Sequence, residues 1–181
     1  MTEYYFDIET YSKGAKPEPA KDKIITIQFQ ELSTREGKPL GKLKILTEWQ
    51  LKSERALLAE FRRRFLTGRD FDFIPIGENL YGFDLISVLH RLNKHFHLHL
   101  NMDFFRDRPV IDIKPTLVMM NKGSFKDYQR LLGKRGQAHL VKQWYENQEY
   151  PTIEKYIRRE ADNFILKYQM LKKQLATMRL Q

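Results

Sequence analysis

Hydrophobic and polar positions change their spacing several times along the chain, and each change indicates a different element of secondary structure. Alternating patterns rich in aromatic and β-branched side chains indicate strands. These strands are predicted over residues 4–9, 23–32, 43–49, 73–76 and 109–113. Apolar residues that recur every three to four positions indicate helices. These helices are predicted over 53–66, from Gly82 past Leu92, over 125–132, and from about Thr152 into the 170s.

The order of these elements predicts the fold class. Three successive strands, followed by strands that alternate with helices, are typical of a mixed sheet with helices on its faces. Ser53 is placed to cap the start of one helix, and Gly133 to end another. Residues 14–19 have the glycine and proline content of a loop. We therefore expect an α/β fold, with residues 1–181 forming one domain.

The composition excludes several classes of protein. The chain has no cysteine, which excludes disulfides and thiolate metal sites and suits a reducing cytoplasm. No apolar run approaches the roughly 18 to 20 residues that a membrane-spanning helix needs. The N-terminus shows no signal-peptide pattern. A cytoplasmic location without a membrane partner is the expectation.

An excess of basic residues suggests a polyanionic partner. Lysine and arginine number 32 against 23 acidic residues, a net charge of +9. Each Lys or Arg that contacts a phosphate releases condensed counterions, which favours nucleic-acid binding. Charge alone does not separate nucleic acid from an anionic membrane surface or from an ordinary solvated surface. A basic cluster around the 125–132 helix is either a solvated face or a track for phosphates: Lys122, Lys126, Arg130, Lys134 and Arg135.

Two acids on the first predicted strand are the first candidates for chemistry. Side chains alternate across a strand, so Asp7 and Glu9 project to one face and Phe6 and Ile8 to the other. Two carboxylates about 6 to 7 Å apart in a half-buried site are costly unless a positive group lies between them. Mg²⁺ prefers carboxylate oxygens. The alternative is an edge strand that carries acids against aggregation.

Two further acids lie at defined places in the predicted helices. Gly82 allows a sharp turn from a strand end into a helix, and Asp84 falls in the first helical turn. There it is either a third metal ligand or a favourable charge at the helix N-terminus. On the last helix, Glu160 lies at the edge of the apolar face and Asp162 points nearly opposite. Glu160 is therefore the better site candidate, unless it pairs with Lys155 or Arg159.

Together these residues resemble the proofreading 3′–5′ exonuclease superfamily, in its four-acid, tyrosine-containing form. Asp7-Ile8-Glu9 is similar to the first motif of that superfamily, D-x-E on the first strand. Asn79-x-x-x-Phe83-Asp84 resembles the second motif of the exonuclease domains of family B DNA polymerases. Tyr156-x-x-x-Glu160 is similar to the third motif, whose acid is usually aspartate.

The resemblance implies a ribonuclease H-like α/β fold of about five strands and a metal-dependent exonuclease. Two divalent ions, Mg²⁺ or Mn²⁺, would lie about 3.5 to 4 Å apart at the scissile phosphate. The implied ligands are Asp7, Glu9, Asp84 and Glu160. Glu9 would contact the attacking water and Tyr156 would orient it. Thr10, Asn79 and Phe83 would hold the terminal nucleotides.

The expected substrate is the 3′ end of single-stranded nucleic acid, with DNA favoured. A polymerase or DNA-repair partner would act in trans, since the sequence carries no polymerase segment. An exoribonuclease on the same scaffold is one alternative. A nucleic-acid-binding module with a weakened exonuclease centre is another, because Glu160 is one methylene longer than the usual aspartate.

Four histidines gather in one region: His90, His95, His97 and His99. The alternation of the last three would suit a metal-binding strand. A zinc site would also need a fourth ligand and supporting hydrogen bonds, which the sequence does not identify. We therefore expect polar positions on a helix end and a loop.

Overall fold

The centre of the computed structural model is a five-stranded sheet with the order β3-β2-β1-β6-β7. The structure describes residues 2–14, 17–67, 70–71, 73–105, 108–133 and 137–177. The first three strands pair antiparallel: β1 (Thr2–Tyr11), β2 (Lys23–Leu32) and β3 (Lys44–Thr47). Strands β6 (Phe73–Gly77) and β7 (Ile111–Asp112) continue the sheet in parallel with β1.

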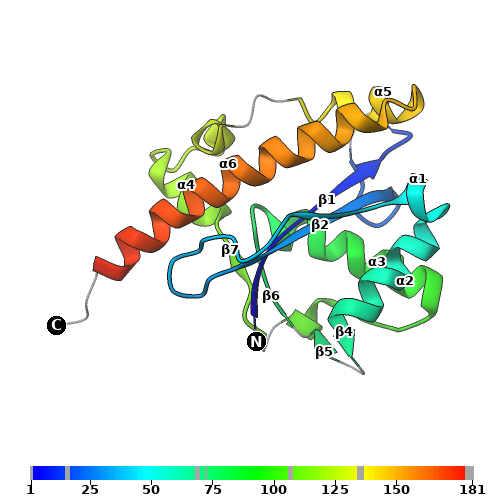
Figure 1. Ribbon diagram of the computed structural model, residues 1–181, viewed down its shortest axis with the longest axis horizontal. Helices are drawn as coiled ribbons and strands as arrows, with labels where there is room; N and C mark the ends of the chain where they lie inside the picture. The colour runs from blue at the N-terminus through cyan, green and yellow to red at the C-terminus, as the bar shows by residue number, and fades with distance from the viewer. Residues whose placement is uncertain are drawn as a thin grey trace.

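Helices cover both faces of this sheet (Figure 1). On one face lie α2 (Glu54–Phe65) and α3 (Leu85–Phe96). On the other lie α4 (Lys114–Met120), α5 (Leu140–Glu146) and the long α6 (Tyr150–Thr177). The short α1 (Glu48–Leu51) follows β3, and β4 (Leu66–Thr67) pairs with β5 (Asp70–Phe71). Among the described residues, no helix is both long and apolar enough to cross a membrane.

The predicted α/β class, a mixed sheet of five strands with flanking helices, is confirmed. Ser53 caps α2 as expected, since its hydroxyl accepts a hydrogen bond from Ala56 N–H at 3.1 Å. The predicted strand over 43–49 was too long. It ends at Thr47, whose hydroxyl accepts from Gln50 N–H at 3.4 Å and so begins α1.

Three other predictions needed correction. The strand over 109–113 is shorter than expected, because only Ile111 and Asp112 pair with β6. The helix over 125–132 is a 3₁₀ turn, η3 (Tyr128–Leu132), although Gly133 ends it with a φ of +70° as expected. Neither α4 nor α5 was predicted, and each has only seven residues. Two turns of helix are too short for a period of 3.6 to be recognised.

The alternation of β1 separates two hydrophobic cores. Phe6 and Ile8 pack with α2 and α3, in a core that includes Leu57 and Val88. Tyr5 faces the opposite side and packs with Phe164 of α6. Phe6 and Ile8 therefore face α2 and α3, and Glu3 and Tyr5 on the opposite side contact α6, which agrees with the predicted alternation of β1.

Candidate functional site

The first feature of the site is a length difference between neighbouring strands. The pairing of β1 with β6 ends at Tyr5 and Ile76, while β1 continues to Tyr11. The chain leaves β6 through Gly77, where a Cβ atom would lie only 2.7 Å from the carbonyl oxygen of Phe6. Glycine therefore lets the chain turn away close to β1, and the second half of β1 lies beside the turn that follows.

That turn, η1 (Leu80–Asp84), is a single π-helical turn that leads into α3. Asp84 at its end is buried, and its Oδ1 accepts a hydrogen bond from Ile8 N–H at 3.2 Å. The carboxylate takes the place of the strand partner that β6 no longer supplies. Asp84 is thereby held against the backbone of β1 at the residue between Asp7 and Glu9.

Asp112, which the sequence reasoning missed, holds the start of η1. Its carboxylate accepts hydrogen bonds from the N–H groups of Asn79 at 2.9 Å and Tyr81 at 3.1 Å. Lys114 Nζ donates to Asn79 Oδ1 at 2.6 Å. A Cβ atom on Gly82 would lie 2.3 Å from the same oxygen, so only glycine fits there without a shift. Asn79 is thus part of the turn, and its predicted contact with a nucleotide stays a prediction.

Asp7 is oriented by neutral donors on the sheet. Its Oδ2 accepts hydrogen bonds from Gln28 Nε2 at 2.9 Å and from Tyr5 O–H at 3.2 Å. Thr26 O–H in turn donates to Gln28 Oε1 at 3.0 Å, and both side chains are fully buried. The pairing register of β1 shifts just beyond Asp7, between Glu9 and Thr10. Such bulges often lie beside active sites, where they re-aim side chains.

Helix α6 brings the last acid to the same face of the sheet. Lys172 Nζ lies 2.6 Å from Glu3 Oε2, an ion pair that fixes α6 on β1. Glu160 is buried and Asp162 is exposed, as the helical phase predicted. Arg159 Nη2 lies 3.9 Å from Glu160 Oε1, which is a long ion pair. The alternative that Glu160 pairs with Arg159 is therefore also supported.

Two buried tyrosines connect the four acids electrostatically. Burial raises the pKa of Tyr5 well above its usual value, and the charges of Asp7, Glu9 and Asp84 raise it further. Burial likewise raises the pKa of Tyr156, together with the charges of Glu9, Glu160 and Asp7. Both phenols therefore stay protonated at neutral pH and can donate a hydrogen bond. The three separate motifs converge on one region of negative charge.

The chemistry of this region suits a hard divalent cation. Carboxylate oxygens are the ligands that Mg²⁺ and Mn²⁺ prefer. No three His, Cys, Asp or Glu side chains in the described part of the chain form a group that could hold a metal ion as they stand. At Asp7, Oδ2 accepts hydrogen bonds from Gln28 and Tyr5. The donor types, four carboxylates, are those that such an ion prefers.

A pocket of about 340 Å³ opens beside these acids, and we name it the Phe83 pocket. Glu9, Thr10 and Phe83 line it together, so the structure brings these three predicted residues to one place. His139 and Lys142 also line it, and the sequence reasoning missed both. They belong to α5 and its N-cap, and no periodicity indicated this helix. Asn79 is not among the lining residues.

A second pocket, of about 390 Å³, adjoins Tyr156. Trp144 and Thr152 line it with the cationic side chains of Lys155 and Arg159. The ring centroids of Trp144 and Tyr156 are 5.8 Å apart, and the Arg159 guanidinium lies 5.8 Å from the Tyr156 ring. Tyr156 is thus bordered by basic and aromatic groups as well as by the acids.

The other candidate clusters have different outcomes. Helix α3 ends at Phe96, and His97 and His99 have positive φ angles, so His95, His97 and His99 occupy a helix end and a loop as expected. His90 differs from the expectation, because it is exposed in the middle of α3. His95 Nε2 lies 2.9 Å from a carboxylate oxygen of Glu54. Within the basic cluster, Lys122, Lys126 and Arg130 are exposed around η3. Lys134 and Arg135 lie outside the described residues.

Comparisons with known proteins give likenesses of fold at low identity. No protein-family model and no curated protein sequence matches the chain. One similar solved structure is that of an exonuclease I, with a TM-score of 0.48 and 15% identity over 67% of this chain and 29% of that chain. Exonuclease I of E. coli in complex with a dT13 oligonucleotide gives a TM-score of 0.48 and 15% identity, over 75% and 31% of the two chains. Its complex with a dA16 oligonucleotide gives 0.49 and 14%, over 66% and 29%. The chain spans less than a third of the length of these exonucleases.

Proposed function

We propose that the chain is a metal-dependent 3′–5′ exonuclease that removes nucleotides from the 3′ end of single-stranded nucleic acid, with DNA favoured. The observation that carries this proposal is the convergence of four carboxylates from β1, η1 and α6. Asp84 accepts a hydrogen bond from Ile8 N–H, between Asp7 and Glu9 on β1. The charges of Glu9, Glu160 and Asp7 all contribute to the raised pKa of Tyr156, so these acids lie near one phenol. A solvated acidic edge strand would leave these carboxylates apart and in water.

In this proposal Asp7, Glu9, Asp84 and Glu160 hold two divalent ions. Such ions lower the pKa of a bound water and stabilise the leaving 3′ oxygen. The protonated Tyr156 hydroxyl donates a hydrogen bond that orients the attacking water, and Glu9 accepts one from it. Gln28 and Tyr5 position Asp7 through the two hydrogen bonds to its Oδ2.

The Phe83 pocket would hold the 3′-terminal nucleotide. The Phe83 ring offers a face for a base, and stacking of this kind is worth about 1 to 3 kcal/mol per base. Thr10 supplies a hydroxyl, and Lys142 a cation for the phosphate. Because Glu9 lines the same pocket, a strand end bound there lies against the acids. A partner polymerase or repair protein, a cytoplasmic location and the kinship with family B polymerases stay predictions.

The test is the fate of a 5′-labelled single strand. We expect a ladder of products that shorten from the 3′ end when the protein is incubated with labelled DNA and Mg²⁺ or Mn²⁺, and an intact strand with chelator. A matched RNA strand, degraded more slowly, checks the preference for DNA. Immediate release of labelled mononucleotide would indicate attack from the 5′ end. Tight binding without hydrolysis under either metal would favour the binding-module alternative.

A further inference from the structure

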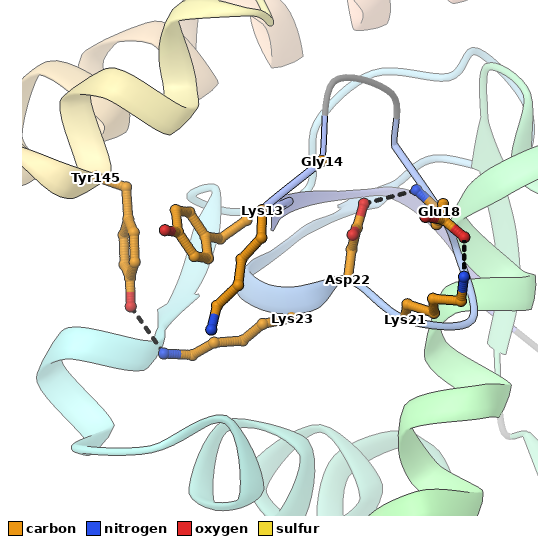
Figure 2. Close-up of a pocket in the computed structure, with 8 residues that line it drawn as sticks. Lys13, Gly14, Glu18, Lys21, Asp22, Lys23 and Tyr145 are labelled. Carbon is orange, nitrogen blue, oxygen red and sulfur yellow. Dashed lines mark hydrogen bonds and ion pairs between the residues drawn. The ribbon is translucent and has the colours of Figure 1, made fainter.

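A third pocket, of about 410 Å³, shares Gly14 with the Phe83 pocket, and we name it the lysine pocket (Figure 2). It lies between the end of β1, the start of β2 and helix α5. Lys13, Lys21 and Lys23 line it with Tyr11 and Tyr145, together with the acids Glu18 and Asp22. None of these residues belongs to the three acidic motifs.

The two acids of the lysine pocket are engaged at one end of it. Glu18 pairs with Lys21 at 2.6 Å, and Asp22 is buried and accepts a hydrogen bond from Glu18 N–H at 2.7 Å. Figure 2 shows these three residues on the side away from Tyr145, whereas the side chains of Lys13 and Lys23 extend toward Tyr145. The charge in the pocket is therefore divided between an acidic end, where two carboxylates face one lysine, and a cationic end.

The cationic end keeps an excess of positive charge. Lys23 Nζ donates to the Tyr145 hydroxyl at 2.8 Å and pairs with Glu48 at 3.0 Å. Lys13 is exposed and forms no ion pair within the described part of the chain. Lys142, from the Phe83 pocket, donates to the carbonyl oxygen of Lys13 at 3.4 Å. The nearby Glu146 does not line the pocket, and its carboxylate accepts a hydrogen bond from the Tyr11 hydroxyl at 3.0 Å.

Aromatic rings form one wall at this end. The Tyr11 and Tyr145 ring centroids are 5.1 Å apart, and Trp49 stacks on Tyr150 at 4.5 Å just beyond them. Cations combined with aromatic faces are the chemistry by which proteins follow a single strand without reading its sequence. Phosphates meet the cations, while bases stack on the rings.

We propose that the lysine pocket binds a backbone phosphate of the same single strand whose 3′ end occupies the Phe83 pocket, upstream of the terminal nucleotide. The two pockets share Gly14 as a lining residue, and Lys142 of the Phe83 pocket donates to the backbone carbonyl of Lys13, so the two pockets are neighbours. This inference rests on the proposed function. Lys13 contributes to the affinity for longer strands and does not take part in hydrolysis.

The test compares Lys13→Glu with Lys94→Glu, a matched charge reversal at an exposed position on α3, across the sheet. Binding of fluorescent dT16 is measured in chelator over a range of salt concentrations, so that it does not depend on catalysis. For Lys13→Glu we expect weaker binding and a salt slope smaller by about 0.7, the value for one phosphate contact on a single strand. Lys13→Arg, which keeps the positive charge, should show the affinity and the salt slope of the wild-type protein. Hydrolysis of a dinucleotide should be the same in all variants, since a dinucleotide does not reach the lysine pocket.

Equal affinity and equal salt slope for the Lys13 and Lys94 charge reversals would overturn the inference. Equal loss on dT16 and on the dinucleotide would also overturn it, because Lys13 would then serve the terminal nucleotide or a free phosphate. If the wild-type protein binds dT16 and hydrolyses nothing, the proposed function fails while a reduced slope for Lys13→Glu still supports the phosphate site.

Discussion

Replacing Asp7 by Asn is expected to abolish metal-dependent hydrolysis of single-stranded DNA. Asn keeps the size of the side chain and can still accept from Gln28 Nε2, so the fold should persist. It removes the negative charge of one of the four carboxylates that are proposed to hold the two ions. Loss of a residue that merely supports a metal ligand costs about 10- to 100-fold. We therefore expect Asp7→Asn to lower the rate by more than about 100-fold, measured from the initial loss of a 5′-labelled strand.

Asp162→Asn is the matched control, since Asp162 is an exposed acid two residues from Glu160 on the same helix. Its rate should equal that of the wild-type protein. If Asp7→Asn retains most of the activity, or if both variants lose the same fraction of it, Asp7 is not a metal ligand. Thermal melting of each variant separates loss of activity from loss of fold.

Arg91→Met is expected to cause the largest loss of stability. Arg91 of α3 is buried, and its Nε donates to Glu54 Oε1 at 2.6 Å, with a second hydrogen bond from Nη2 to Oε2. Ile24 N–H donates to the same carboxylate at 2.8 Å, so the Glu54 carboxylate connects α2 with α3 and with the start of β2. Removing one partner leaves a buried charge uncompensated, which costs about 3 to 5 kcal/mol. Urea unfolding measures the change in the free energy of unfolding.

Arg63→Met provides the control, because Arg63 pairs with Glu60 on the exposed side of α2. An exposed pair of this kind contributes about 0 to 1 kcal/mol. A loss in Arg91→Met no larger than that in Arg63→Met would contradict the importance of the buried pair.

The buried pair of Glu54 and Arg91 also makes the stability of the protein depend on pH. Burial alone would raise the pKa of Glu54, but hydrogen bonds from Arg91, His95 and Ile24 N–H hold it below its ordinary value. A carboxyl whose pKa is lowered by folding stabilises the protein fully above its unfolded pKa, near about 4.3. That stabilisation is lost as the pH falls through the folded pKa. Between neutral pH and acid, the wild-type protein should therefore lose more stability than Arg91→Met.

Long, strongly patterned elements could be predicted from the sequence. Strands β1 and β2 and helices α2 and α6 each have ten or more residues, so the pattern of each is long enough to be recognised. The helical phase also separated Glu160 from Asp162 correctly. Both results depend only on the period of the pattern, which local sequence carries.

Features that depend on tertiary contacts could not be predicted. The burial of Asp84 arises from the early end of β6, which leaves Ile8 N–H for a carboxylate 76 residues away. The role of Asp112 arises from the pairing of the two-residue β7 with β6. His139 and Lys142 reach the Phe83 pocket because α5 packs beside β1, although seven residues show no clear period.

Titration of Mn²⁺ into the metal-free protein tests most directly whether the four carboxylates act as one divalent-cation site. The wild-type protein should bind two ions and melt at a higher temperature as they bind, with about 2.7 kcal/mol of added stability for each ion at 100 times its Kd. Asp162→Asn should behave like the wild-type protein, and Asp7→Asn should lose both the binding and the rise in melting temperature. Binding of equal strength in wild type and Asp7→Asn, or no binding in the wild-type protein, would contradict a metal-dependent nuclease centre at β1.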